Sequence, residues 1–400
     1  MPVVPDMPSV VAEAAEKEAS AFEPFATFHV EGWHNTAGGV KNTGWWDSLL
    51  DAGFTINFEK IGGPAGLSFF ANVHWAENRQ CSSAFADYTG AANPASNIMA
   101  ADRARIRLYN FYFSQTWSEG HYTVKLGQLA ADDDFMSSDY SALFLNSAFG
   151  SMPSQVATPL FRGNSAYPVY AVASPGVWFN WKPGERFSWQ TGLYYSGPGQ
   201  DSHTNYGTDW EHSHEGGILI FSEAAFSTAF GKIPTSFKLG LVAHTAKVAN
   251  FRRQNSAHED AVAHGLFSFY AIQDINLIPG KEDATVLGAF WRVGWSPQSD
   301  RTVVALYADT GLNWFGPIPS RPDDVLGAGV SMTKYGHSFR DADGEIAGVE
   351  TTLELTYAAK LTEWWSVQVD TQFLFNPLRR EDSGKRKTAV VFGLRSTLSF

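Results

Sequence analysis

The last twelve residues of the chain alternate between two kinds of side chain. Counting back in steps of two gives Phe400, Leu398, Ser396, Leu394, Phe392 and Val390, and most residues between them are small or polar. Because side chains alternate across a β-strand, this pattern predicts a strand with one apolar face. A closed membrane barrel must pair its last strand with its first, since an open edge leaves backbone groups unsatisfied in lipid. The pattern therefore predicts a closing strand, with Phe400 in the aromatic girdle at the membrane surface.

The same alternation recurs along the chain, for example over residues 67–76, 187–195, 237–244, 352–359 and 367–375. We count about fifteen such segments after residue 50, and residues 25–33 supply another, so the expected total is the even number of about sixteen. The predicted fold is an all-β transmembrane antiparallel β-barrel with a short N-terminal periplasmic helical segment. A barrel of this size encloses water, so its apolar faces point outward and its polar faces inward.

Composition agrees with this fold class. The chain has 30 Phe, 14 Tyr, 14 Trp and 36 Gly, a profile typical of barrels whose lipid-facing residues are only every second one. No stretch approaches the roughly 18 to 20 unbroken apolar residues of a membrane-spanning helix. The net charge of −12 argues against nucleic acid as a partner, because phosphate binding requires a basic surface.

The first 53 residues are predicted to form a separate periplasmic segment, with the barrel over residues 54–400. Residues 8–23 are rich in Ala and Glu, with Ser9 as helix N-cap, and residues 45–52 suggest a second short helix closed by Gly53. The residues that follow Met1 do not show the basic region and the subsequent apolar run of an intact export signal peptide. We therefore expect the export signal of a barrel protein to have been removed.

Connections between the predicted strands fall into two classes. Residues 182–185 and 296–300 read as short turns, whereas residues 81–100, 131–167 and 197–216 are long. Short turns on one rim and long loops on the other are the pattern of outer-membrane barrels.

Several sequence blocks resemble the carbohydrate-selective porin family, OprB. They are residues 106–112, 125–129, 134–135, 138–147, 167–168, 311–316, 321–327, 350, 353–357 and 370–377, in that order along the chain. The sequence departs from the family pattern at Val369, where a proline is frequent, and around residues 38–44. The resemblance implies an outer-membrane porin, monomeric or trimeric, that passes glucose and related sugars by facilitated diffusion.

Three arginines, Arg103, Arg105 and Arg107, share one face of a predicted strand. They lie about 6.6 Å apart, and in mid-membrane each would cost roughly 2 to 4 kcal/mol if it faced lipid. They must therefore line the lumen or a rim. The planar guanidinium, with several donors, suits the vicinal hydroxyls of a sugar. Lys125 on the next strand extends this row.

Further candidate pore-lining residues follow from the inferred inward faces. They are Glu223, Arg292, Glu354, Asp370 and the aromatic Trp178. Carboxylates accept hydrogen bonds from sugar hydroxyls and offset the arginines, and Trp178 or Tyr194 would stack on a pyranose ring. The alternative for the charged residues is a structural ion-pair network, and for the two aromatics a place in the girdle or rim.

Other functions remain as alternatives. An anion-selective porin would use the same arginines, because the sequence does not say how far the carboxylates cancel them. A barrel enzyme would need a nucleophile, a His and an acid; no G-x-S-x-G elbow is present, and we predict no enzyme activity. A soluble lectin would share the alternation but turn its apolar faces inward.

We predict no cofactor. The run Asp132, Asp133 and Asp134 would suit a hard cation, and His212 with His214 a weak zinc site, but a solvated loop explains both. The expected partners are carbohydrate solutes together with the lipid and lipopolysaccharide of the outer membrane.

Overall fold

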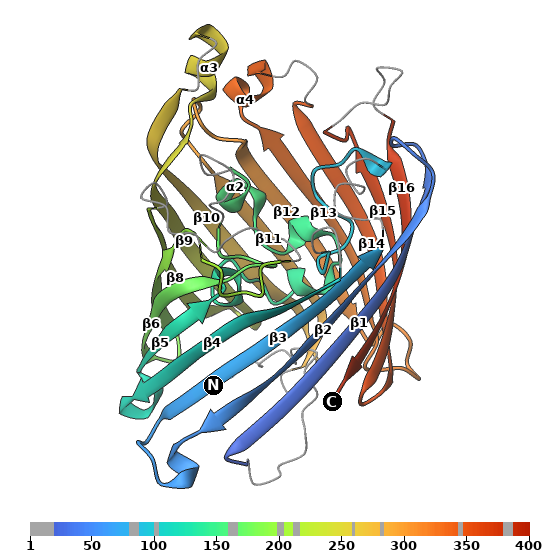
Figure 1. Ribbon diagram of the computed structural model, residues 1–400. Coiled ribbons are helices and arrows are strands. Elements are labelled where there is room, and N and C mark those ends of the chain that lie inside the picture. The colour runs from blue at the N-terminus through green and yellow to red at the C-terminus, as the bar shows by residue number, and fades with distance from the viewer. Residues whose placement is uncertain are drawn as a thin grey trace.

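The protein forms a closed antiparallel β-barrel (Figure 1). The computed structural model describes residues 20–79, 88–99, 104–158, 167–197, 204–210, 217–257, 261–280, 284–342, 347–378 and 387–400. Within these ranges each strand pairs with its neighbours in sequence, and β1 pairs with β16. The strands are β1 Phe22–Ala37, β2 Gly44–Asn57, β3 Leu67–Arg79, β4 Arg105–Trp117, β5 Tyr122–Leu129, β6 Ser174–Gly184, β7 Phe187–Tyr195, β8 Ile218–Phe230, β9 Ile233–Ala249, β10 Val262–Pro279, β11 Thr285–Trp295, β12 Val304–Phe315, β13 Val325–Tyr335, β14 Val349–Thr362, β15 Trp365–Phe375 and β16 Ala389–Ser399. The predicted fold class and strand number are confirmed.

The helical elements that lie wholly within the described ranges are short and occur in the connections. They are η1 Glu59–Ile61, η2 Ser118–Gly120, η3 Ala131–Asp133, η4 Ser141–Leu143, η5 Ser147–Phe149, α2 Pro153–Val156, α3 Phe251–Ala257 and α4 His337–Ala342. Among the described residues, no helix is both long enough and apolar enough to cross a membrane.

The two rims of the barrel differ. β1 begins and β16 ends at the same rim, since Thr27 pairs with Ser399. The connections at that rim are short, such as residues 185–186 and 231–232, whereas residues 130–173 at the other rim join β5 to β6. Outer-membrane barrels place their short turns in the periplasm, so the lower rim in Figure 1 is the periplasmic one.

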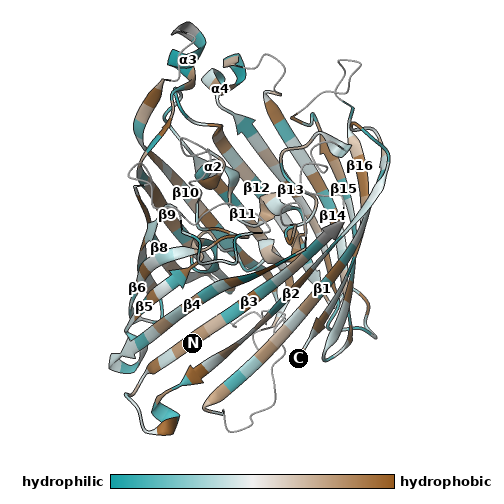
Figure 2. Ribbon diagram, in the orientation of Figure 1, coloured by the Kyte–Doolittle hydropathy of each residue, from teal (hydrophilic) through white to brown (hydrophobic). Residues whose placement is uncertain are grey.

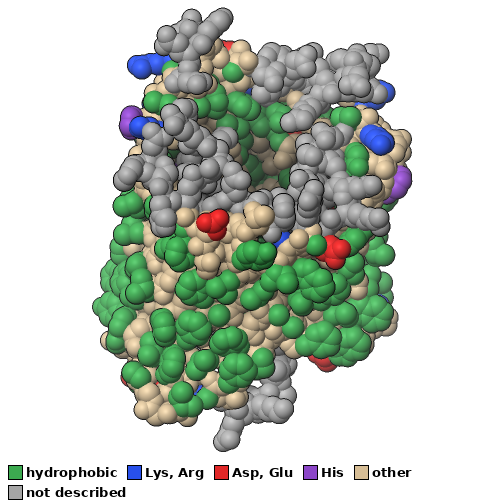
Figure 3. Space-filling model, in the orientation of Figure 1, with side chains coloured by type: hydrophobic (Ala, Val, Ile, Leu, Met, Phe, Trp, Pro, Cys, Tyr) green, Lys and Arg blue, Asp and Glu red, His purple; other side chains and the backbone are tan. Residues whose placement is uncertain are grey.

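The outer wall is apolar. Leu126, Leu239 and Leu394 are 58%, 66% and 52% exposed there, and hydrophobic side chains cover the lower half of the face in Figure 3. Hydropathy alternates along each strand in Figure 2, as the sequence predicts. Phe400 stacks on Trp364 with ring centroids 6.4 Å apart, and its place in an aromatic girdle stays a prediction.

The predicted boundary after residue 53 is wrong. Residues 45–52 are not helical but belong to β2, in which Trp45 pairs with Trp33 and Asp47 with Glu31. Cross-strand pairing on both edges overrides the local helical pattern, because backbone groups at membrane depth need partners. The barrel therefore begins at Phe22. The helix predicted over residues 8–23 falls mostly outside the described residues, and its last two residues belong to β1.

One polar pair on the outer wall yields a stability prediction. The indole Nε1 of Trp291 donates to Oε1 of Gln273 at 2.6 Å, on two positions that face each other across β10 and β11. Replacing Trp291 by Phe leaves that amide oxygen without its donor beside lipid. We expect the free energy of unfolding in lipid vesicles to fall by about 1 to 3 kcal/mol. Adding Gln273→Leu should restore most of the loss, and Trp314→Phe, another change on the outer wall, serves as the control.

Candidate functional site

The connection between β5 and β6 folds into the barrel. We call residues 130–158 and 167–173 the inserted segment. In Figure 1 they lie inside the barrel, surrounded by its strands. Aromatic packing holds this segment: the ring of Phe144 lies 4.6 Å from that of Phe149 and 5.7 Å from that of Phe290 on β11. All three rings are buried. The inserted segment thus narrows the lumen of the barrel. The candidate functional site is the part of the lumen beside this segment.

Glycines on the inner wall make room for these rings. A Cβ at Gly327 would lie 2.6 Å from Leu143, and one at Gly329 would lie 2.8 Å from Phe144. Real Cβ atoms do not approach that closely. The small residues of β13 therefore let the inserted segment lie directly against the wall.

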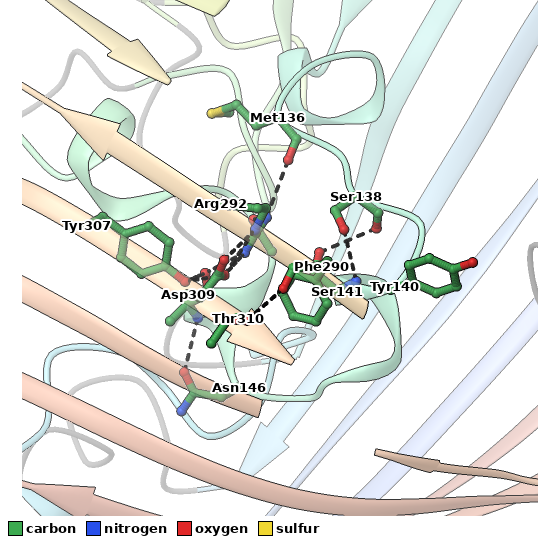
Figure 4. A network of polar contacts seen from close by, with 12 residues as sticks. Met136, Ser138, Tyr140, Ser141, Asn146, Phe290, Arg292, Tyr307, Asp309 and Thr310 are labelled. Carbon is green, nitrogen blue, oxygen red and sulfur yellow. Dashed lines mark hydrogen bonds and ion pairs between the residues drawn. The ribbon is translucent and has the colours of Figure 1, made fainter. Parts of the chain in front are cut away.

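Arg292 fastens the inserted segment to the wall (Figure 4). Its Nε and Nη2 donate to the Asp309 carboxylate at 3.0 and 2.5 Å. Its remaining donors bond to carbonyls of the segment: Nη1 to Met136 and Gly150 at 3.3 and 2.7 Å, and Nη2 to Ala148 at 3.1 Å. Arg292 is only 1% exposed, so it acts as an anchor in this structure.

The predicted inward carboxylates also bind protein groups. Glu354 accepts from the backbone N–H groups of Leu145 and Asn146 at 2.6 and 3.0 Å. Glu223 accepts from the N–H of Met136 at 3.3 Å and from the Tyr270 hydroxyl at 2.7 Å, and Asp370 accepts from Gln372 at 2.9 Å. All three carboxylates face inward and are buried. Their partners in these contacts are neutral protein groups, so these contacts differ from the ion-pair network that the sequence left open.

A second connection, residues 88–99 between β3 and β4, also lies against the inner wall. Glu350 on β14 accepts from the N–H groups of Ala92 and Asn93 at 3.0 and 3.2 Å. The N–H of Ser147 donates to the carbonyl of Pro94 at 2.9 Å. The two inserted connections therefore support each other. The sequence analysis predicted none of these contacts. It only placed residue 350 among the residues that resemble the family.

Part of the arginine row lies beneath the end of the inserted segment. Arg105 and Arg107 face inward on β4 but are buried, and Arg107 donates to the carbonyls of Ala171 and Asn205 at 2.8 and 3.3 Å. Arg103 falls outside the described residues. Burial raises the pKa of the neighbouring Tyr170 hydroxyl, which keeps its proton and donates to the carbonyl of Ile98 at 2.7 Å.

Lys125 is less buried than Arg105 and Arg107. Its Nζ bonds to Asp134 at 2.6 Å and lies 4.5 Å from the Trp178 ring centroid. Trp178 and Tyr194 both point inward and are buried, which contradicts the girdle alternative for them. Asp133 is exposed and accepts from Asn110 at 2.7 Å. This part of the site thus combines the compensated charge of Lys125 with the acceptor group of Asp133, which already binds Asn110.

The sequence reasoning missed a polar group on β2 and β3. Asp51 Oδ1 accepts from Asn72 at 2.8 Å and lies 3.5 Å from His74 Nε2. The His74 ring stacks on Tyr109 with centroids 4.0 Å apart, and the Asp51 side chain is 30% exposed. Asp51 was missed because its segment was predicted to be a helix. The sequence does place Trp45, Asp47, Leu49 and Asp51 at every second position, as on one face of a strand, and this spacing could have identified Asp51 as an inward-facing residue.

The described residues contain no group of three or more His, Cys, Asp or Glu side chains that could hold a metal ion. Asp132 instead accepts from Ser151 Oγ and the N–H of Tyr170, both at 2.9 Å. His212 and His214 lie outside the described residues.

The chain is similar to known porins. The model of the carbohydrate-selective porin, OprB family matches residues 31–400. Three solved structures share the fold. The high-pH structure of Pseudomonas putida OprB has a TM-score of 0.82 at 20% identity and covers 95% of this chain and 94% of its own. The outer membrane channel DcaP of Acinetobacter baumannii has a TM-score of 0.55 at 10% identity, covering 98% and 100%. Salmonella typhi OmpF in complex with daunomycin has a TM-score of 0.53 at 9% identity, covering 95% and 97%.

A search of curated proteins found no match. The family model covers most of the chain, and the closed barrel has the fold of outer-membrane channels. The chain therefore belongs to the carbohydrate-selective porin, OprB family, and is a porin of the bacterial outer membrane.

Proposed function

We propose that the chain passes monosaccharides such as glucose across the outer membrane by facilitated diffusion. The observation that carries this proposal is the pairing of inward-facing cations with carboxylates. Lys125 pairs with Asp134, Arg292 with Asp309, and Arg395 with Glu31. Paired charges produce little net field, so a neutral solute meets hydrogen-bonding groups without strong competition from ions.

The hydrogen-bonding groups suit a polyhydroxylated solute. The partly exposed Asp51 and Asp133 carboxylates accept bonds, and Lys125 donates them. Many weak contacts let a solute leave as readily as it enters. In this proposal Arg105 and Arg107, which are buried beneath the end of the inserted segment, hold the lining of the pore in place. Arg103 is the member of the row that we propose, from the sequence alone, as a donor to the solute. Lipid and lipopolysaccharide would contact the apolar outer wall, around a monomer or a homotrimer.

The alternative is an anion-selective or general diffusion pore. It is favoured by the adjacent inward positions of Arg105 and Arg107 on β4. In this case the two guanidinium groups would dominate the field in the constriction, and phosphate or carboxylated solutes would pass in preference to sugars.

Single-channel recording in a planar bilayer tests the proposal. We expect added glucose to reduce the KCl conductance saturably and the reversal potential to show weak ion selectivity. Strong anion selectivity that glucose does not affect would instead support the alternative.

A charge-pair cycle adds a matched prediction. Lys125→Gln unmasks Asp134 and should shift the reversal potential toward cation selectivity, and Asp134→Asn should shift it toward anions. The double variant should return close to the wild-type value, because the pair is then removed as a unit. Equal reversal potentials in all four proteins would show that this pair does not shape the field in the pore.

A further inference from the structure

The inner wall near the periplasmic rim carries aromatic side chains where a water-filled lumen favours polar ones. Phe25 on β1, Phe70 on β3 and Tyr112 on β4 point inward, and we call these three residues the aromatic strip. Their positions follow from the strand pairing, in which Phe70 faces Tyr112 and Phe25 faces Gly53. Gly53 faces the lumen between the first two strands of the strip and adds no side chain there.

The three rings form a continuous surface. The rings of Phe25 and Phe70 lie 5.8 Å apart with an interplanar angle of 12°, and those of Phe70 and Tyr112 lie 5.2 Å apart at 27°. All three are half-buried. Nearly parallel planes at this spacing are offset stacks, which leave ring surface open to the lumen.

Neither the lipid face nor the inserted segment explains the strip. The sequence neighbours Phe69 and Phe113 form a separate pair, 5.0 Å apart, on the opposite face of the wall. Among the described residues, the buried clusters that pack the inserted segment include neither Phe25 nor Phe70, and Tyr112 only touches their edge. Apolar surface kept in contact with water is a feature of binding sites.

Polar groups border the strip on the constriction side. His29 lies four positions from Phe25 on the same face of β1, where its Nδ1 bonds to Thr397 at 2.8 Å. Asp51 lies two positions from Gly53, and Lys125 Nζ lies 5.3 Å from the Tyr112 ring centroid. Flat apolar rings edged by donors and acceptors match a pyranose, which has apolar C–H faces and hydroxyls around its rim.

We propose that the aromatic strip is a stacking track for neutral pyranose sugars on the periplasmic side of the constriction. This inference rests on the proposed function, since it takes the sugar as the solute of the pore. The strip gives the sugar a second weak site below the constriction, so that release proceeds in small steps.

The test compares matched variants on the two faces of the same strands. Glucose is added from the short-turn side of a planar bilayer, and its dissociation constant is read from the block of KCl current. Phe25→Leu and Phe70→Leu should each weaken the block by about two- to tenfold and leave the KCl conductance in place. Phe69→Leu and Phe113→Leu, on the lipid face, should not weaken it. Sorbitol, which has no ring, should bind the wild type and Phe70→Leu equally.

Three results would overturn the track. The first is wild-type glucose affinity in the Phe25→Leu/Phe70→Leu double variant. The second is equal weakening for glucose and sorbitol. The third is a lower unfolding temperature of the barrel with an unchanged glucose block, which would assign the rings to stability. The proposed function fails separately, if glucose does not block the wild-type channel.

Discussion

Replacing Arg292 by Met is expected to release the inserted segment from the barrel wall. The guanidinium bonds to Asp309 and to three carbonyls of the segment. Methionine keeps an unbranched apolar stem but has no donors, so Asp309 stays buried without its cation. Breaking a buried pair on one side costs about 3 to 5 kcal/mol. We expect a lower unfolding temperature, higher single-channel conductance and weaker glucose block.

A second substitution separates the two effects. Adding Asp309→Asn removes the buried charge, so the double variant should recover much of the stability. Its conductance should stay high, because the carbonyls of Met136 and Gly150 still lack the Arg292 donor, and Ala148 keeps only the Tyr307 hydroxyl. Arg186→Met, in an exposed turn, controls for loss of an arginine. Wild-type conductance in Arg292→Met would mean that aromatic packing alone holds the segment.

Filling the space beside Phe144 is expected to disturb the same contact at a smaller cost. A Cβ at Gly329 would already lie 2.8 Å from Phe144 and 3.0 Å from Phe149, so Gly329→Val forces the rings away from β13. Overpacking of this kind costs about 1 to 3 kcal/mol and shifts the backbone. We expect a less stable barrel with an altered, noisier conductance, measured by thermal unfolding and by single-channel recording.

The chain provides a matched control on the outer wall. A Cβ at Gly32 on β1 would meet nothing within 4 Å, so Gly32→Val should leave both stability and conductance close to wild type. The comparison holds the substitution constant and changes only the surroundings. If both variants behaved alike, the tight contact between β13 and the inserted segment would not exist in the membrane.

The barrel could be predicted from the sequence because alternation is a local property. Each strand in lipid shows its two faces in its own residues, and closure follows from the requirement that no edge stays open. The prediction failed over residues 45–52, where the pattern of Trp45, Leu49 and Gly53 imitates a short helix. Pairing with β1 and β3 decides the structure there, and that pairing is not visible in a window of eight residues.

The site was less accessible to prediction. Alternation placed Arg292, Glu223 and Glu354 on the inner face, yet it could not show that a distant segment covers them. Their partners are backbone groups of residues 136–150, which carry no sequence signature of bonding to a wall. The resemblance to the family includes residues 138–147, but it did not predict that these residues fold into the barrel. A role of the arginine row in solute contact stays a prediction.

The anchoring contacts of the inserted segment span long stretches of sequence. Glu354 holds the N–H of Leu145 from 209 positions away, and Arg292 holds the carbonyl of Gly150 from 142 positions away. Contacts of this separation carry a large loop-closure entropy and form slowly. The segment lacks these partners until β11 and β14 are in place. The narrowing of the pore is therefore expected among the last events of folding, and a barrel still in assembly would be wider and less selective than the finished one.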